Sequence, residues 1–344
     1  MYGSSGEHTG RKEGEMKVLI TGIHGFVGTN LRKYLQHAEL YGIDRVQPAV
    51  PEVIKTFCWE ELRTEAAPSG DLPDLDAIIH LAGKAHDTCN EALAQEYFDI
   101  NTGLTQQVFD FFLTSAARTF IFFSSVAAVT DCVVGHTLTE DVIPTPKGPY
   151  GESKIRAGEY ILDRCATDPY CVSGKKKVYI LRPCMIHGPG YKGNLNLLYN
   201  VVKKGIPRSL ADFENRRSFA SIDNICYVVE QLLNRDIPSG IYHVGDDEAI
   251  STNELIRLIS EITEKNTPSW KFNKGLMERC AGVGSLLHLP LNIERLRKLT
   301  ENFVVSNARI KAALGIKEMP VRAEDGLRKT IRSFETDKVA VEDL

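Results

Sequence analysis

The sequence lacks the patterns that mark several large classes of protein. No apolar run approaches the ~18 residues that a membrane span needs, and neither a CxxC nor an HExxH pair of metal-ligating residues occurs. No segment repeats along the chain. Neither sign of charge dominates, because 41 basic and 45 acidic residues are mixed along 344 residues and leave a net charge of −4. These absences predict no metal site, no nucleic-acid partner and no membrane partner.

A dense set of cysteines is also missing. The 8 cysteines are scattered along a long chain, whereas disulfide scaffolds are small and cysteine-rich, so we expect reduced thiols in a cytoplasmic protein. The first fifteen residues, MYGSSGEHTGRKEGE, are polar and glycine-rich and contain no apolar core. We expect them to form a disordered tail over residues 1–15 rather than a secretory signal. On this interpretation Met16 is a hypothetical natural start.

What is present is an alternation of short apolar runs with helical patterns. The runs lack polar alternation, as expected of strands that helices cover on both faces. Amphipathic patterns lie between them, at 26–36, at 90–117 and after Tyr150. This rhythm predicts a Rossmann-type fold of the α/β class, a doubly wound parallel sheet with right-handed crossovers. The predicted strands are 16–22, 39–44, 76–83, 119–125 and 176–183.

The sequence pattern changes after residue 183. Loop-like stretches and shorter helices follow, and Ser251 with Glu254 has the spacing of a capping box at a helix start. We predict a nucleotide-binding domain over 16–183, which 219–245 rejoins, and a smaller, interleaved α/β part over 184–344 that binds substrate. Helices are predicted in this second part near 195–204, 225–234 and 323–334.

A glycine-rich turn joins the first predicted strand to the first helix. Gly22, Gly25 and Gly28 have the spacing GxxGxxG, which suits a tight turn, close backbone approach to a pyrophosphate and close helix–strand packing. The helix N-terminus then offers free N–H groups to the phosphates. Asp44 ends the second strand, where a carboxylate accepts hydrogen bonds from a ribose and repels a 2′-phosphate. This pattern predicts bound NAD rather than NADP, although Arg45 acts in the opposite direction.

A tyrosine and a lysine lie four residues apart in the stretch PYGESK. With 12 tyrosines in the chain, chance alone supplies about one such pair, and a second pair begins at Tyr199. Tyr150 and Lys154 differ from it because they follow a strand that ends in Ser124 and Ser125. Ligands of doubly wound sheets bind beyond the carboxyl ends of the strands, which places both serines and the glycine turn on one edge. For Tyr199 we therefore predict only a packing role.

These residue types suit the removal of a hydride from an alcohol carbon. The alcohol oxygen must then lose its proton, and a phenol with a pKa of ~10 becomes a base only when a positive charge stabilises the phenolate. We expect Lys154 to supply that charge and to lower the pKa of Tyr150. The hydroxyl of Ser125 can hydrogen-bond the same substrate oxygen.

The motifs TGxxGFxG, HLAG, SS and YxxxK together resemble the extended short-chain dehydrogenase/reductase family, from Met16 to about residue 334. Within that family the chain looks most like the nucleotide-sugar epimerases and the 4-keto-sugar reductases. The resemblance implies a homodimer, packed through the helices at 90–117 and 150–168, that acts on a nucleotide-diphosphate sugar.

Site residues follow from the same resemblance. It implies Ser125, Tyr150 and Lys154 as catalytic residues. It implies Ser125, Asn194 and Arg217 as substrate-binding residues, with Arg216 as a competitor for the last role. The implied cofactor contacts are Gly22, Gly25, Phe26, Val27, Gly28, Asp44, Arg45, Leu81, Ala82, Gly83, Asn101, Ser124, Tyr150, Lys154 and Pro183.

Three functions remain open at this point. Sugar dehydratases of the family carry an Asp-Glu pair after the catalytic serine, and Val126 with Ala127 cannot move a proton, so we expect no dehydration. The carboxylate of Asp44 favours a NAD-retaining 4-epimerase of a UDP-hexose. The alternative is a reductase of 4-keto-6-deoxy nucleotide sugars that consumes NAD(P)H. A non-catalytic NAD-binding regulator is the third interpretation, which the intact catalytic trio disfavours.

Overall fold

The computed structural model describes residues 15–62, 72–85, 93–133, 137–191, 193–203, 215–264 and 301–342, with side chains up to residue 336. The predicted tail before Glu15 lies outside these residues, as do parts of the predicted helix at 90–117.

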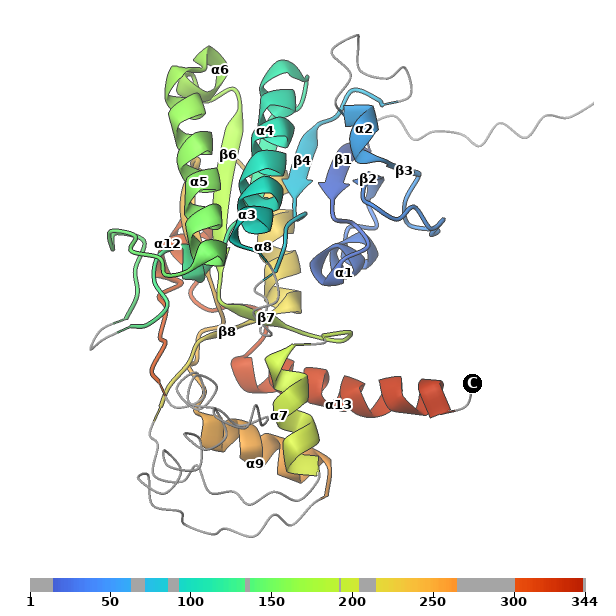
Figure 1. Cartoon of the computed structure of the whole chain (residues 1–344), viewed down its shortest axis with the longest axis vertical. Coiled ribbons are helices and arrows are strands. Elements are labelled where there is room, and N and C mark those ends of the chain that lie inside the picture. The colour runs from blue at the N-terminus through green and yellow to red at the C-terminus, as the bar shows by residue number, and fades with distance from the viewer. Residues whose placement is uncertain are drawn as a thin grey trace, which may run out of the picture.

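A seven-stranded sheet forms the upper part of the molecule, and every neighbouring pair of its strands is parallel (Figure 1). The strands are short and lie under helices on both sides, which explains their continuous apolar sequences. In spatial order they are β3 (Lys55–Phe57), β2 (Ala38–Ile43), β1 (Met16–Thr21), β4 (Ala77–His80), β5 (Thr119–Phe123), β6 (Lys177–Pro183) and β9 (Gly240–Val244).

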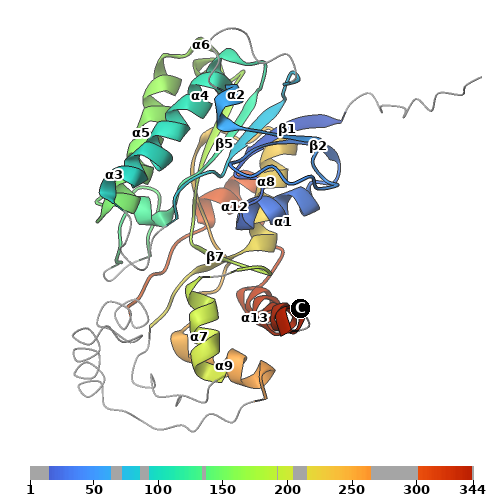
Figure 2. The same ribbon diagram turned by 45° about the vertical axis from the view of Figure 1, so that its right-hand side comes forward.

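Helices cover both faces of the sheet (Figure 2). One face carries α4 (Leu104–Thr114) and α5 (Pro149–Thr167), and the other carries α1 (Phe26–Tyr34), α8 (Ile222–Asn234) and α12 (Ala308–Leu314). Consecutive strand residues therefore enter different cores. Leu19 packs with Phe109 of α4, whereas Val18 and Ile20 pack with Leu31 of α1. This confirms the predicted doubly wound fold. Short helices α2 (Trp59–Leu62), α3 (Ala94–Tyr97) and α6 (Pro169–Val172) complete this part.

A smaller part lies below the sheet. Two short parallel strands, β7 (Met185–His187) and β8 (Phe219–Ser221), lead into it. Its core joins α7 (Asn194–Lys203), α9 (Thr252–Ile262) and α13 (Ala323–Glu342) (Figure 1). Tyr199 is fully buried there and its ring lies 5.3 Å from that of Phe334, which is the packing role predicted for it. Strand β9 returns to the main sheet beside β6.

Several local features differ from the sequence predictions. The predicted helix at 90–117 is interrupted by a π-helical turn, η1 (Phe98–Gly103). Strand β3 was not predicted. The predicted capping box of Ser251 and Glu254, by contrast, is present. Ser221, rather than a residue of the first turn, caps α8, because its hydroxyl accepts the backbone N–H of Asp223.

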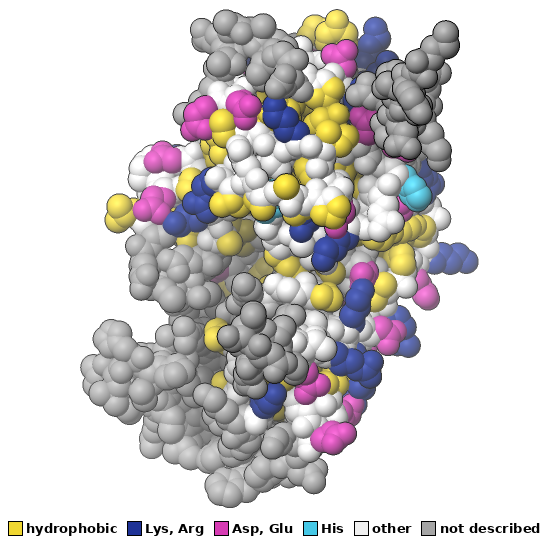
Figure 3. All heavy atoms as spheres, turned by 90° about the vertical axis from the view of Figure 1, so that its right-hand side faces the viewer, with side chains coloured by type: hydrophobic (Ala, Val, Ile, Leu, Met, Phe, Trp, Pro, Cys, Tyr) yellow, Lys and Arg dark blue, Asp and Glu magenta, His cyan; other side chains and the backbone are white. Residues whose placement is uncertain are grey.

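The surface carries mixed charge. Figure 3 shows acidic and basic side chains interspersed over one face of the molecule. Within the described ranges, no helix is long and apolar enough to cross a membrane. Among the same residues, no group of three or more His, Cys, Asp or Glu side chains is placed to hold a metal ion.

Candidate active site

The carboxyl ends of the parallel strands bring the predicted site residues to one edge of the sheet. Strand order reverses between β1 and β4, which is where doubly wound folds bind their ligands. Gly22 follows β1, Asp44 follows β2, Leu81 follows β4 and Ser124 follows β5. The edge therefore joins four segments that are far apart in the sequence.

The glycine turn has no room for side chains. Gly22 adopts a left-handed φ of +71°, which L side chains rarely adopt. A Cβ on Gly28 would lie 2.5 Å from the carbonyl oxygen of Gly22, so α1 packs directly against the turn. Gly25 is the N-cap residue of α1, where no side chain caps the helix and no acidic residue occupies the first turn. The amide groups at this end of α1 can therefore bind an anion.

Asp44 is held in place beside this turn. One carboxylate oxygen accepts the backbone N–H of His24 at 3.0 Å, and the other accepts that of Arg45 at 2.7 Å. The ring of His24 lies 3.3 Å from the hydroxyl of Thr56. The carboxylate is thus fixed at the end of β2, whereas the side chain of Arg45 is exposed.

Tyr150 and Ser125 are hydrogen-bonded to each other. Ser125 caps a 3₁₀ turn, η2 (Val126–Ala128), where its Oγ accepts the backbone N–H of Ala127 at 3.1 Å. Tyr150 stands in the first turn of α5. A Cβ on the next residue, Gly151, would collide with the carbonyl oxygen of Ala127. The absence of a side chain at Gly151 therefore lets α5 approach η2 closely enough for the tyrosine and serine to meet.

Lys154 lies one turn further along α5 and is 5% exposed. Its Nζ donates to the carbonyl oxygen of Phe123 at 2.9 Å. A Cβ on Gly83 would lie 3.0 Å from this Nζ and 2.8 Å from Oδ1 of Asn101. Only glycine at position 83 allows the end of β4 to lie this close to both side chains.

Burial controls the protonation of the pair. It raises the pKa of Tyr150, and the hydrogen bond from Ser125 opposes this rise. In the protein alone the pKa of Tyr150 is therefore raised, and the expected lowering by Lys154 does not prevail. Burial also lowers the pKa of Lys154 to about 8, so its ammonium form still outnumbers the neutral amine about tenfold at pH 7.

A family model described as the NAD dependent epimerase/dehydratase family matches residues 18–245. The chain belongs to this family. It is 27% identical to a UDP-glucose 4-epimerase of Vibrio cholerae over 337 residues, 95% of this chain and 98% of the relative. It is 25% identical to a GDP-6-deoxy-D-mannose reductase of Pseudomonas aeruginosa over 262 residues, 72% of this chain and 80% of the relative.

The fold of this NAD-dependent epimerase/dehydratase is shared with solved structures. The crystal structure of UDP-glucuronic acid 4-epimerase from Bacillus cereus in complex with NAD matches with a TM-score of 0.70 at 19% identity, over 93% of this chain and 99% of that one. These findings confirm the predicted fold, the family resemblance, the enzyme class and the dependence on NAD.

The residues present fit a dinucleotide. The uncapped N-terminus of α1 suits the pyrophosphate, and the fixed carboxylate of Asp44 suits a ribose without a 2′-phosphate. Gly83 keeps the end of β4 free of a side chain beside Lys154 and Asn101. The backbone of Ala82 lies against Gly22, because a Cβ on that glycine would be 3.0 Å from the nitrogen of Ala82.

Of the predicted substrate residues, Asn194 and Arg217 lie on the lower side of this edge. Asn194 is the first residue of α7. Arg217 is half-buried, and its guanidinium lies 5.9 Å from the ring centre of Phe303. Arg216, its competitor, is exposed and donates to the carbonyl of Ala249 at 3.1 Å.

Phe26 links this lower side to the cofactor turn. The ring of Phe26 packs edge-on against that of Tyr191 at 5.6 Å, three residues before Asn194. Pro183 ends β6 directly before the buried Cys184.

Sequence reasoning missed two residues of the site. Gly151 was not singled out, although glycine inside a helix usually has a packing reason. Tyr97 was also missed. It is 4% exposed, and its ring meets that of Tyr150 edge-on at 6.2 Å. No local pattern marks an aromatic residue as an active-site neighbour, because the contact joins α3 to α5.

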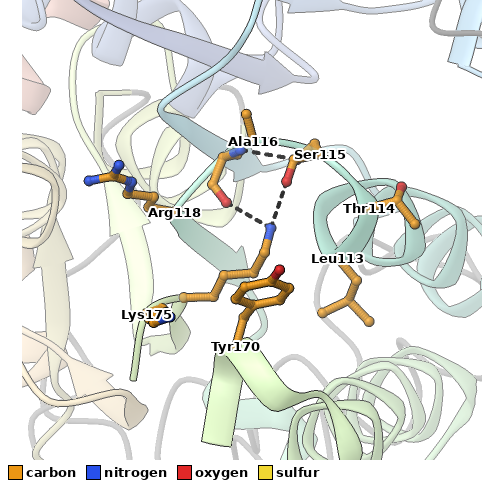
Figure 4. A pocket seen from close by; sticks show the side chains of 9 residues that line it. Leu113, Thr114, Ser115, Ala116, Arg118, Tyr170 and Lys175 are labelled. Atoms are coloured by element: carbon orange, nitrogen blue, oxygen red, sulfur yellow. Dashed lines mark hydrogen bonds between the residues drawn. The ribbon is translucent and has the colours of Figure 1, made fainter. Parts of the chain in front are cut away.

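A hollow elsewhere on the surface is not part of this site. It has a volume of about 620 Å³ and is lined by residues 113–118, Tyr170, Lys175 and Lys176 (Figure 4). These residues precede β5 and β6, so the hollow lies at the amino ends of the strands, opposite the candidate active site.

Proposed function

We propose that the protein is a NAD-dependent 4-epimerase of a nucleotide-diphosphate sugar, of the UDP-hexose type. The observation that carries the proposal is the hydrogen-bonded pair of Tyr150 and Ser125, one helical turn from a buried Lys154. The pair stands at the edge where the glycine turn and Asp44 fit NAD. The similarity to a UDP-glucose 4-epimerase over 95% of this chain supports the choice of reaction.

Bound NAD supplies the chemistry of accepting a hydride from the sugar C4 and returning it to the opposite face. Tyr150 takes the proton of the C4 hydroxyl as general base and returns it as general acid. Ser125 hydrogen-bonds the same oxygen and stabilises its developing charge. Lys154 holds a positive charge nearby, because at neutral pH it remains largely protonated. Val126 and Ala127 offer no proton, which disfavours dehydration.

We propose that the smaller part of the chain holds the nucleotide. Arg217 presents a guanidinium whose planar fork suits the diphosphate oxygens, and the backbone at Asn194 starts α7 beside Tyr191. This assigns 16–183 with 219–245 to NAD and most of 184–344 to the sugar nucleotide. We also propose a homodimer through α4 and α5.

A reductase of 4-keto-6-deoxy nucleotide sugars is the second candidate. The similarity to the Pseudomonas aeruginosa GDP-6-deoxy-D-mannose reductase favours it, and the exposed Arg45 beside Asp44 can accommodate the 2′-phosphate of NADPH. The two reactions differ in their need for reductant. An epimerase interconverts UDP-glucose and UDP-galactose without added NAD(P)H, whereas a reductase consumes it in proportion to product.

Tyr150→Phe tests the mechanism, because it removes the phenolic oxygen and keeps the ring. We expect kcat for UDP-hexose interconversion to fall by 10²-fold or more, roughly the contribution of one general acid–base group, while NAD affinity changes little. The measurement is product formation by chromatography, with NAD binding measured by fluorescence on the same preparation.

Tyr199→Phe is the matched control, since Tyr199 is the other tyrosine four residues before a lysine. Lys203 Nζ lies 3.3 Å from its hydroxyl, but Tyr199 belongs to the core of the smaller part and Lys203 is exposed. This variant should keep wild-type kcat. Full activity of Tyr150→Phe would refute the proposed base, and activity only with added NADPH on 4-keto sugars would establish the reductase instead.

A further inference from the structure

His80 is a fully buried histidine at the end of β4 that the proposed chemistry does not use. Its Nδ1 lies 2.7 Å from the hydroxyl of Thr21 and its Nε2 lies 2.9 Å from that of Thr105. All three side chains have no solvent exposure. The imidazole stacks on the ring of Phe122 at 5.8 Å, so its orientation is fixed by packing as well as by hydrogen bonds.

The bonding partners assign a direction to this chain of hydrogen bonds, which joins Thr21, His80 and Thr105. Thr105 donates its hydroxyl hydrogen to the carbonyl oxygen of Asn101 at 2.6 Å, so it must accept the hydrogen of His80 Nε2. The bare Nδ1 then accepts from the hydroxyl of Thr21. That hydroxyl in turn accepts the backbone N–H of Ala82 at 3.1 Å. The hydrogen bonds run one way, from Ala82 through the imidazole to Asn101.

Both ends of the chain lie on segments that fit NAD. Ala82 lies in the segment that follows β4, between the predicted cofactor residues Leu81 and Gly83. At the other end, the side chain of Asn101 bonds the backbone N–H and carbonyl of Lys84 at 2.7 and 3.2 Å. It also donates to the hydroxyl of Ser153 at 3.0 Å, which is the neighbour of Lys154. The π-helical turn that carries Asn101 is thus tied to β4 and to α5 together.

Only a neutral imidazole keeps this order. A second ring hydrogen, on Nδ1, would face the hydrogen that the Thr21 hydroxyl donates, and that hydroxyl would lose its acceptor. Among the residues that the structure describes, no carboxylate bonds the ring. Burial together with the charge of Lys154 lowers the pKa of His80 to about 3. The ring therefore stays neutral at any working pH near 7.

We propose that His80 is a positioning residue for NAD, which through Thr21 and Thr105 fixes the backbone of β4 and the π-helical turn against which the cofactor binds. The inference rests on the proposed placement of NAD along this edge. It differs from a purely structural role because loss of the chain should weaken NAD binding in a protein that remains folded.

Thr105→Val breaks the chain while keeping the shape of the side chain. Thr330→Val is its matched control, because Thr330 is also fully buried. Its hydroxyl bonds a buried histidine, His187, at 2.9 Å, and also donates to the carbonyl four residues earlier, that of Gly326, at 2.9 Å. We expect Thr105→Val to weaken NAD affinity by about tenfold, since small displacements of positioned groups have large effects. Thr330→Val should stay within about twofold, although both variants lower the melting temperature.

The experiment titrates NAD into the full-length chain stripped of bound nucleotide, and records thermal unfolding of each variant. His80→Leu completes a double-mutant cycle. If the chain of hydrogen bonds acts as a unit, His80→Leu and Thr105→Val together weaken NAD binding no more than either variant alone. Nitrogen-15 NMR of labelled histidine should show His80 with its hydrogen on Nε2 and no titration from pH 5 to 8.

Three results would overturn the inference: unchanged NAD affinity in Thr105→Val, an equal loss in Thr330→Val, or a His80 hydrogen on Nδ1. A failure of the wild-type chain to bind NAD at all would instead refute the proposed cofactor site. The two failures are therefore distinguishable.

Discussion

Lys176 binds backbone carbonyls at the C-terminal end of α4, at the edge of the sheet opposite the active site. We expect removal of its ammonium group to lower the free energy of unfolding. The side chain is 6% exposed. Its Nζ donates to the carbonyl oxygens of Phe112, Ser115 and Ala117 at 2.7, 2.9 and 2.9 Å. An ammonium group has three hydrogens, so each is used. A positive charge here also suits the negative end of the helix dipole.

Lys176→Met keeps the apolar stem and removes the three donors. The carbonyl of Phe112 keeps the hydroxyl of Ser115 as a donor at 2.9 Å, so the loss falls on Ser115 and Ala117. Ser115 and Ala117 both line the hollow of Figure 4. Ser115 is half-buried, so water can replace the ammonium there, whereas Ala117 has no solvent exposure. One buried carbonyl left without a donor costs about 1–3 kcal/mol. Burial lowers the pKa of Lys176, so relief of its desolvation offsets part of the loss. We expect the free energy of unfolding to fall by about 2 kcal/mol.

Urea denaturation followed by circular dichroism measures the difference. Lys175→Met is the control, because Lys175 is the exposed neighbour on the same hollow and its loss should change stability by less than about 0.5 kcal/mol. NAD affinity should be unchanged in both variants, since the hollow lies at the amino ends of β5 and β6. Equal stability of the two variants would refute the reasoning that buried carbonyls at the end of α4 need this ammonium.

Two further predictions concern the active-site helix and acid stability. Gly151→Ala should lower kcat by about tenfold or more, because its Cβ would collide with the carbonyl of Ala127 and displace Tyr150. Gly158→Ala is the control, since a Cβ there has no neighbour nearer than 3.9 Å, and it should leave kcat unchanged. Equal kcat in both variants would contradict this. Burial lowers the pKa of His80 to about 3 and of His243 to about 4, so below pH 6.5 the unfolded chain binds more protons than the folded one. Stability should therefore fall from pH 6.5 towards 4, by up to roughly 2.7 kcal/mol per pH unit for the two groups; equal urea midpoints at pH 7 and 5 would count against it.

The main sheet could be predicted from the sequence because its strands are buried on both faces. Such strands leave continuous apolar runs that stand out from helical patterns, and β1, β2, β5 and β6 were placed within two residues of their bounds. Strand β3 has only three residues, Lys55–Phe57, at the edge of the sheet. So short a segment carries too little pattern to be recognised.

The interruption of the 90–117 helix had no such signal. The π-helical turn at Phe98–Gly103 follows from hydrogen bonds between distant segments, those of Asn101 to Lys84 and Ser153. The residues of the turn are compatible with an ordinary helix. Tertiary contacts, rather than local preference, therefore decide its geometry.

The candidate site was predictable where one motif holds the chemistry and unpredictable where the contact joins two motifs. The YxxxK spacing and the serine-ended strand pointed to Tyr150, Lys154 and Ser125, which the structure brings to one edge. No motif in the sequence pointed to a role for His80, because its partners, Thr21 and Thr105, are far away in the chain. Their association depends on the pairing of β1 with β4 and on the packing of α4.

In the proposed mechanism, the electrostatics of the site make deprotonation of Tyr150 depend on an added positive charge. Burial raises the pKa of Tyr150 and lowers that of Lys154, so desolvation moves both groups towards their neutral forms. The serine hydrogen bond opposes this for the tyrosine, and the carbonyl of Phe123 holds the ammonium. A phenolate in this setting needs a further positive charge, and the oxidised nicotinamide that the family uses carries one. The low polarity that weakens the proposed base in the free protein strengthens its attraction to that charge. The proposed mechanism therefore couples proton removal to the presence of the oxidant.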